Sequence, residues 1–309
     1  MPHRYVAYPN QVLSGSEYGS GQVSIPTDEN QRKKKPPMPI TAGKVSQFAE
    51  RTARELMVDT LWPLASTGPM KESRERLRLL RASYRGQPAL VIGNGPSING
   101  QNLGKMPNFV TIAANAFFLK SDSVGVSPMF LTVEDPLPAE DNKERLKAYS
   151  GATKIAPWDL RGIFGDNSEY IYCNFQRTYA PFVAGRFPLY SDDFSRRAYW
   201  GGTVLYMNIQ LASYLGCNPI YLIGVDLSYQ IPSSAKVEGN IITSTEDDPN
   251  HFDATYFGAG KRWHLPETER MQRCIYSAYE HLRQRGVSLI NATDGGNLQG
   301  LPRADFNTL

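Results

Sequence analysis

The 309-residue chain has few cysteines and no long apolar run. Its three cysteines, Cys173, Cys217 and Cys274, are odd in number and far apart, which excludes a disulfide framework and a cysteine zinc site. No stretch of 18 apolar residues occurs, so we expect no membrane-spanning helix. The first residues, MPHRYVAYPNQ, lack the apolar segment of a signal peptide. These absences predict a protein of the reducing cytoplasm.

An excess of charge of one sign is also missing. The chain has 33 basic and 30 acidic residues, a net charge of +3, which argues against a nucleic-acid partner bound through bulk charge. The chain contains no D-x-D, H-E-x-x-H or C-x-x-C string, so no metal site is predicted. It contains no G-x-S-x-G string either, which leaves a serine hydrolase without support.

The N-terminal region divides into two parts by composition. Residues 1–42 are rich in Gly, Ser, Pro, Gln and charge, which predicts a flexible or extended arm. Its Lys33-Lys34-Lys35 run is either a solvated tail or a contact with an anionic membrane surface or a partner subunit. Residues 43–85 are predicted to be helical, over 44–62, where apolar residues recur every three or four positions, and over 70–84. These helices would cover a sheet face or an oligomer interface.

The remaining residues, 86–309, alternate between short apolar runs and helical patterns. Strands are predicted at 88–93, 108–114, 129–134, 153–156, 169–174, 218–225 and 286–291, and helices at 202–216 and 266–285. Short, continuously apolar strands are typical of a parallel sheet that is buried on both faces. This order predicts an α/β fold with a mostly parallel, Rossmann-like sheet.

A glycine-rich loop, Gly93-Asn94-Gly95-Pro96-Ser97, follows the first predicted strand. Ligands bind at the carboxyl ends of parallel strands, and glycines let a backbone approach a ligand closely. Ile98 replaces the third glycine of the dinucleotide fingerprint, and no acidic residue ends the second strand. No P-loop string occurs either. The loop is therefore either a tight turn without a ligand or a nucleotide site of another class, whose free backbone N–H groups would suit a phosphate.

Polar residues follow other predicted strands and open the next helix. Asn115 ends the second strand, Glu134-Asp135 the third, and Asp226 through Tyr229 the strand at 218–225. Gly202-Thr203 opens an apolar helix, where unpaired N–H groups and a hydroxyl face an anion. Since parallel strands end at one edge, these groups are expected to converge on one site.

The polar segment 230–263 is predicted to be a long binding loop or lid. His251 lies within this segment and His264 just beyond it, and both are candidate proton carriers, while His281 is expected to be a solvated helix residue. His251 could share the cleft with the carboxylate of Asp253. Lys261 and Arg262 are expected to keep His264 neutral by like-charge repulsion. The acidic run 246–248 is expected to be solvated.

Taken together, these motifs resemble those of the bacterial sialyltransferases of glycosyltransferase family 42 and of the related MptE-like family of surface-polysaccharide gene clusters. The resemblance covers roughly residues 86–300. Its carriers are the loop 93–97, Asn115, the sequence 134–136, the sequence 201–203, the strand 221–226, His264 and the sequence 291–293.

The resemblance implies a glycosyltransferase A-type variant of the Rossmann-like fold and a metal-independent, inverting transfer of a CMP-linked sugar. It implies that His264 is the general base and that Tyr229 bonds the departing phosphate. The implied donor-binding residues are Gly93, Asn94, Gly95, Pro96, Ser97, Asn115, Asp135, Gly202, Thr203 and Asp226. Beyond the donor, a glycan or lipid-linked acceptor, peripheral membrane contact and a homo-oligomer are implied, and no further cofactor.

One departure from the sialyltransferase pattern leaves two other functions open. Asp135 occupies the position where a donor-binding asparagine is expected, and this E-D-P variant resembles the MptE-like branch. That branch is named after an archaeal enzyme that transfers diphosphate from ATP to a hydroxymethylpterin. In that case Asp135 and Asp226 would be Mg²⁺ ligands. The third possibility is a non-catalytic nucleotide-binding or assembly protein.

Overall fold

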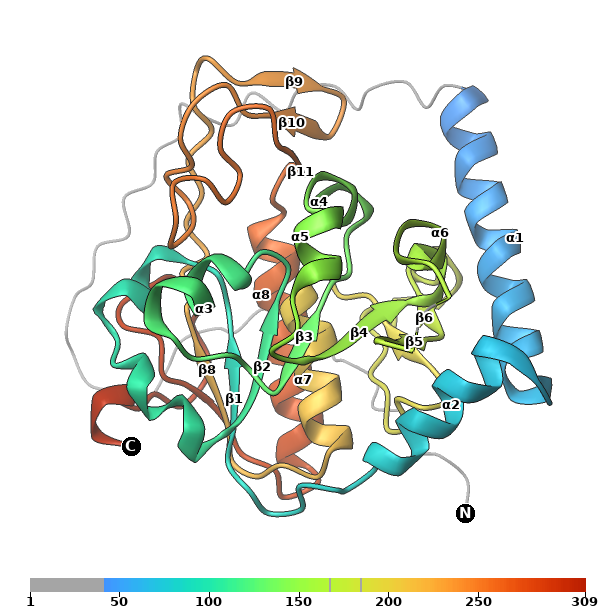
Figure 1. The fold of residues 1–309 in the computed structure, drawn as a ribbon, viewed down its shortest axis with the longest axis horizontal. Helices are drawn as coiled ribbons and strands as arrows, with labels where there is room; N and C mark the ends of the chain where they lie inside the picture. The colour runs from blue at the N-terminus through green and yellow to red at the C-terminus, as the bar shows by residue number, and fades with distance from the viewer. Residues whose placement is uncertain (1–41, 167, 184) are drawn as a thin grey trace, which may run out of the picture.

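A parallel sheet forms the centre of the computed structural model, which describes residues 42–309 except 167 and 184 (Figure 1). Within this part of the chain, seven strands pair in the order β12-β8-β1-β2-β3-β4-β5, every pair parallel. The strands are β1 (Ala89–Ile92), β2 (Val110–Ala114), β3 (Phe130–Thr132), β4 (Thr153–Pro157), β5 (Tyr170–Cys173), β8 (Ile220–Ile223) and β12 (Leu289–Asn291). Each predicted strand region overlaps one of them, which confirms the Rossmann-like α/β fold. The predicted arm, 1–42, lies outside the described residues except for its last residue.

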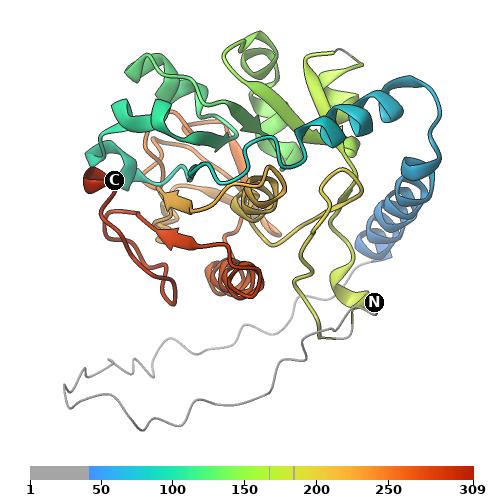
Figure 2. The same ribbon diagram turned by 90° about the horizontal axis from the view of Figure 1, so that it is seen from below.

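The strands are apolar throughout because helices cover both faces of the sheet. Successive residues of β1 belong to different cores: Val91 packs on one face and Ile92 on the other. The first face carries α7 (Val204–Tyr214) and α8 (Thr268–Arg283). The second carries α3 (Phe118–Val124), α5 (Lys143–Ala148) and α6 (Arg161–Phe164). Figure 2 shows the sheet between these two layers.

Two helices precede the sheet, close to where the sequence predicts them. These are α1 (Ala42–Leu64) and α2 (Gly68–Leu80). The Ser73 hydroxyl of α2 accepts a hydrogen bond from the backbone N–H of Tyr172 at 3.1 Å, so α2 covers the edge strand β5. In α1 the Trp62 side chain is buried, and its indole N–H donates to the carbonyl of Ser195 at 2.7 Å. Both helices are therefore fixed to the body of the protein.

The segment 230–263 is not the open loop that the sequence suggests. It holds β9 (Lys236–Glu238) and β10 (Ile241–Thr243), and β11 (Arg262–His264) completes a three-stranded antiparallel sheet with them. Each strand has only three residues, too few for apolar alternation or length to reveal it. This small sheet lies above the main sheet in Figure 1.

Short elements complete the described chain. They are α4 (Pro136–Asp141), the strand pair β6 (Phe175–Gln176) and β7 (Ala198–Tyr199), and the 3-10 helices η1 (Pro96–Gly100), η2 (Leu103–Asn108), η3 (Trp158–Leu160), η4 (Ala180–Phe182) and η5 (Phe306–Thr308). The three cysteines are buried as free thiols. None of the helices in the described part of the chain combines the length and the apolar character needed to cross a membrane.

The strand order places a switch point at β1. From β1 the chain moves through β2 to β5 on one side, whereas β8 and β12 lie on the other side. The connections after β1 and β8 therefore diverge at the carboxyl edge of the sheet. Such a point is where open parallel sheets bind their ligands.

Candidate functional site

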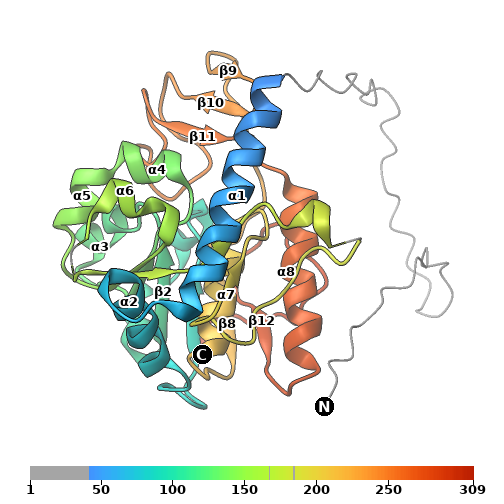
Figure 3. The same ribbon diagram turned by 90° about the vertical axis from the view of Figure 1, so that its right-hand side faces the viewer.

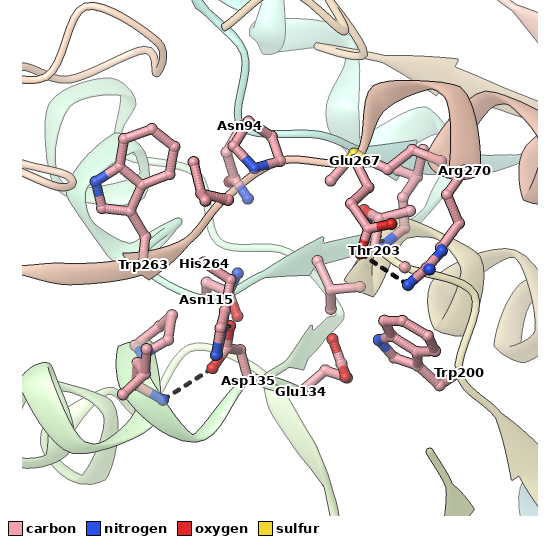
Figure 4. Close-up of a pocket in the computed structure, with 18 of the residues that line it drawn as sticks. Asn94, Asn115, Glu134, Asp135, Trp200, Thr203, Trp263, His264, Glu267 and Arg270 are labelled. Atoms are coloured by element: carbon pink, nitrogen blue, oxygen red, sulfur yellow. Dashed lines mark hydrogen bonds and ion pairs between the residues drawn. The ribbon is translucent and has the colours of Figure 1, made fainter. Parts of the chain in front are cut away.

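A cavity of about 1120 Å³ opens at this carboxyl edge, where the ends of β1, β2, β3 and β8 meet α7 and β11 (Figure 4). Ten of the predicted site residues line it: Gly93, Asn94, Gly95, Asn115, Asp135, Gly202, Thr203, Asp226, Tyr229 and His264. Pro96 and Ser97 do not; they lie in the first turn of η1 behind the loop. The convergence of separate segments on one site, expected from the parallel strands, is present.

The amides of the two loop glycines are not free, although the sequence suggests that they are. The N–H of Gly93 donates to the carbonyl of Ile223 at 2.7 Å, and that of Gly95 donates to the carbonyl of Gly224 at 2.9 Å. A Cβ on Gly95 would collide with the Asp226 carboxylate. These glycines thus allow the loops after β1 and β8 to pack against each other.

The carboxyl group of Asp226 contacts the loop from within the protein. Its Oδ2 accepts a hydrogen bond from the Ser97 hydroxyl at 2.8 Å. Burial raises the pKa of Asp226, while the hydrogen bonds from Ser97 oppose that rise. Near Ser97, a carboxylate therefore takes the place that the sequence analysis assigned to a phosphate.

Two asparagines leave buried oxygens available in the cavity. The Oδ1 atoms of Asn94 and Asn115 are buried and have no hydrogen-bond partner among the described residues. Asn115 has a left-handed backbone, with φ of 52°, and its side chain bonds the hydroxyl of Tyr256. Buried acceptors normally have a partner, so these two oxygens are candidates to accept a hydrogen bond from a ligand.

His264 and Asp135 form a hydrogen-bonded pair that joins two distant parts of the chain. His264 ends β11, where it pairs with Ile241 of β10, and Asp135 caps α4 by accepting from the N–H of Leu137 at 2.9 Å. The His264 Nδ1 lies 2.7 Å from the Asp135 Oδ2. The His264 side chain is 41% exposed, so it can meet a molecule that enters from solvent.

The direction in which the pKa of His264 was expected to shift is wrong. Its hydrogen bond to Asp135 raises its pKa, an effect that partial burial opposes. Lys261 and Arg262 do not hold it neutral, since both side chains turn to α4, where Lys261 bonds the carbonyl of Asp141 and Arg262 pairs with the Asp141 carboxylate. These partners lie about 120 positions away in the sequence, so sequence adjacency does not reveal them.

A buried ion pair lies beside this histidine pair, and the sequence analysis did not assign it. Arg177 pairs with Glu134 and also reaches Asp159 at 3.1 Å. Burial raises the pKa of Glu134 to about 7, although Arg177 opposes the rise. Arg177 follows a two-residue strand, so no pattern in the sequence marked it as part of a site.

The start of α7 forms the opposite side of the cavity (Figure 4). The Thr203 hydroxyl oxygen caps α7 by accepting from the N–H of Leu205 at 3.3 Å, and Gly202 before it has φ of 81°. Arg270 pairs with Glu267 at 2.8 Å and lies over the Trp200 ring. A helix start with a nearby arginine is a favourable environment for an anion.

His251 also lines the cavity, but its carboxylate partner is not Asp253. Its Nδ1 lies 2.6 Å from the Oδ2 of Asp248, which is buried, not solvated as expected. The His251 ring stacks on Tyr256 at 4.1 Å. Tyr229 packs between His251 and Trp263, and burial raises its pKa to about 12.

Metal-ligating side chains are dispersed in this structure. Within residues 42–309, apart from 167 and 184, no group of three or more His, Cys, Asp or Glu side chains is arranged to hold a metal ion.

The fold and cavity define a Rossmann-like α/β protein with a large cavity at the switch point of its sheet. The family described as "6-hydroxymethylpterin diphosphokinase MptE-like" matches residues 67–232, more than half of the chain, and the chain belongs to this family. No curated protein matches the chain. A similar solved structure is that of the MAf glycosyltransferase from Magnetospirillum magneticum AMB-1, with a TM-score of 0.46 and 16% identity. The match covers 87% of this chain and 43% of that one.

Proposed function

We propose that this protein is a nucleotide-sugar-dependent glycosyltransferase that uses a CMP-activated donor in bacterial surface polysaccharide or glycan synthesis. The transfer would invert the anomeric centre, with a glycan or a lipid-linked molecule as acceptor. The site of action would be the cytoplasm, at the inner face of the membrane. The pairing of His264 with Asp135 at a cavity large enough for a nucleotide and a sugar carries this proposal.

His264 is suited to be the general base. The Asp135 carboxylate accepts a hydrogen bond from Nδ1–H, which leaves Nε2 as the nitrogen that can take a second proton. In the proposed step, the acceptor hydroxyl gives its proton to Nε2 while its oxygen attacks the anomeric carbon. The bond from that carbon to the donor phosphate breaks on the opposite face, and the phosphate leaves with the electron pair.

The donor would lie deeper in the cavity than the histidine. The unpaired oxygens of Asn94 and Asn115 can accept hydrogen bonds from ribose hydroxyls or from the amino group of a base. Because the amides of Gly93 and Gly95 are already bonded, we assign the departing phosphate to the α7 start at Thr203, with Tyr229 as a second donor.

The description of the family supports a second candidate, a pterin diphosphokinase, which needs Mg²⁺ between the transferred phosphates. Asp135 and Asp226 would be its ligands. Both oxygens of Asp135 already accept protein hydrogen bonds, and Asp226 accepts from Ser97. This engagement favours an orienting carboxylate over a metal ligand, so we place the diphosphokinase second.

A nucleotide panel separates these functions. Thermal unfolding would be followed with CMP, CDP, UDP, ATP and GTP, each with and without Mg²⁺. We expect CMP to raise the midpoint without Mg²⁺, because binding to the folded state stabilises it. A shift with ATP that requires Mg²⁺ would favour the diphosphokinase. If nucleotides bind but no CMP-sugar or ATP is turned over, the protein is a non-catalytic binder.

Catalysis is tested with matched histidine variants. His264→Gln should bind CMP as the unmodified protein does, yet hydrolyse or transfer a CMP-sugar about 10²–10⁴-fold more slowly. His281→Gln is the control, since His281 also pairs with a carboxylate, Asp192 at 2.8 Å, but lies outside the cavity lining. The sequence analysis did not predict that pairing. Full activity in His264→Gln would show that His264 is not the general base.

A further inference from the structure

One face of α1 both anchors the helix and reaches the cavity. Phe48, Arg51, Glu55 and Trp62 follow one another at helical spacing and share this face. In the second half of the helix, Glu55 accepts from the N–H of Thr178 at 2.9 Å, and Trp62 is buried. In the first half, Phe48 and Arg51 line the cavity. Figure 3 shows this end of α1 level with the small sheet that carries His264.

Arg51 is a cation without a carboxylate partner beside the proposed base. Of the three arginines that line the cavity, Arg177 pairs with Glu134 and Arg270 pairs with Glu267. Arg51 forms no ion pair within 4.0 Å with any described residue. Arg51 and His264 line the same cavity, and the charge of Arg51 lowers the pKa of His264, an effect smaller than that of Asp135.

Two exposed aromatic rings stack at this end of α1, and one of them, Phe48, lines the cavity one helical turn before Arg51. Phe48 and Phe182 of η4 stack with ring centroids 6.4 Å apart, although their side chains are 42% and 63% exposed. Ala180 and Pro181 of η4 also line the cavity. Exposed apolar groups gathered at the mouth of a cavity are typical of a surface that a ligand covers.

We infer that α1 and η4 form an acceptor subsite for a sugar that bears a carboxylate or a phosphate. Arg51 pairs with the anion, and the Phe48–Phe182 pair packs against the apolar face of the sugar ring. The subsite rests on the proposed function in that His264 removes the proton of the bound sugar's hydroxyl. Both α1 and His264 lie outside residues 67–232, so the family match does not cover this subsite.

The test measures binding and does not depend on turnover. Glucuronate, glucose 1-phosphate, glucose and sulfate would each be titrated into the full-length protein, with the ring resonances of His264 as the readout. We expect both anionic sugars to bind about tenfold or more tightly than glucose, the range expected for a charge-assisted hydrogen bond. Arg51→Gln should reduce that preference to less than about twofold, while Arg51→Lys should retain part of it.

Two further variants complete the test. Arg54→Gln is the matched control, because Arg54 is exposed on the same helix but does not line the cavity, and it should keep the full preference. Phe182→Ala should weaken the binding of both anionic sugars and should not strengthen the binding of glucose. The unfolding midpoint of each variant would be compared with that of the unmodified protein. We expect no change, because these side chains are exposed.

The inference is overturned if glucose binds as tightly as glucuronate, if Arg51→Gln keeps the preference, or if sulfate binds as well as the anionic sugars. Its failure is distinct from failure of the transferase. If glucuronate binds in a manner that depends on Arg51 but CMP does not bind, the subsite is supported and the CMP-activated donor is rejected. A response to CMP without a preference for anionic sugars would do the reverse.

Discussion

Asp135 accepts two hydrogen bonds, each with a different oxygen. Oδ1 accepts from the Leu137 N–H and starts α4, while Oδ2 accepts from His264. The first bond fixes the carboxylate, so the second holds the imidazole in one orientation. One oxygen of Asp135 therefore has a structural role, as the cap of α4, and the other raises the proton affinity of His264.

Asp135→Asn therefore tests the pair with little change in shape. The amide oxygen can still cap α4, but the negative charge that raises the pKa of His264 is lost. A base must be neutral to act, so activity rises with pH through the His264 pKa. We expect the acid limb of the rate profile to move to lower pH in Asp135→Asn. We also expect kcat to fall by about 10²–10⁴, as for other oriented bases.

The control for this variant is Asp192→Asn, which removes the carboxylate beside His281. Its pH–rate profile should match that of the unmodified protein. An acid limb that stays in place in Asp135→Asn would show that His264 is not the group whose titration limits the rate.

Gly95 tests how the two loops at the switch point pack. Gly95→Ala would push a methyl group into the Asp226 carboxylate, so we expect a loss of about 1–3 kcal/mol in the free energy of unfolding, measured in urea. Combining it with Asp226→Ala removes most of the collision and should recover part of that loss. Gly162→Ala, which adds a methyl group in open space, should change stability little. If Gly95→Ala destabilises the protein equally with Asp226 present and with Asp226→Ala, the added methyl group does not collide with the Asp226 carboxylate.

At the scale of elements, the sequence predicts what is long and apolar. All seven strands of the main sheet and the helices α1, α2, α7 and α8 fall within a few residues of their predicted positions. Their signals are continuous apolar runs and helical periodicity, which burial imposes directly. The strands β9 to β11 were missed because each has only three residues, too few to show the alternation of a strand.

Helix α1 depends on one buried acceptor as well as on Trp62. The Oε2 of Glu55 accepts from the N–H groups of Arg177 and Thr178 and from the Thr178 hydroxyl. Glu55→Ala leaves these donors unsatisfied, so we expect a loss of about 1–3 kcal/mol in the free energy of unfolding. Glu50→Ala, on the exposed face of the same helix, should change it by less than about 0.5 kcal/mol. Similar losses in both variants, measured in urea, would contradict an anchoring role for Glu55.

At the scale of the whole molecule, the candidate site joins residues that the sequence separates widely. The sequence predicted that strand ends converge, because parallel strands share an edge, and ten of the twelve predicted residues do line the cavity. It did not predict the partners: His264 pairs with a residue 129 positions away, and the amides of Gly93 and Gly95 are taken by β8 and the residue after it. Such pairings depend on loop paths, which leave no periodic signal.

The last prediction concerns where the folded unit begins. A chain that starts at Ala42 should unfold at the same urea midpoint as the full chain, because the composition of residues 1–41 gives them little apolar surface to bury. A chain that starts at Thr67, where the family match begins, loses α1. Removal of the buried Trp62 side chain alone should cost about 3–5 kcal/mol, and the ion pair between Asp59 and Arg197 is lost with it. The shorter chain should also lose the discrimination between glucuronate and glucose, since Arg51 is absent.

If the chain from Thr67 is as stable as the full chain, α1 does not contribute to the folded unit and is not a wall of the site. If the chain from Ala42 fails to fold, the first 41 residues belong to the folded unit.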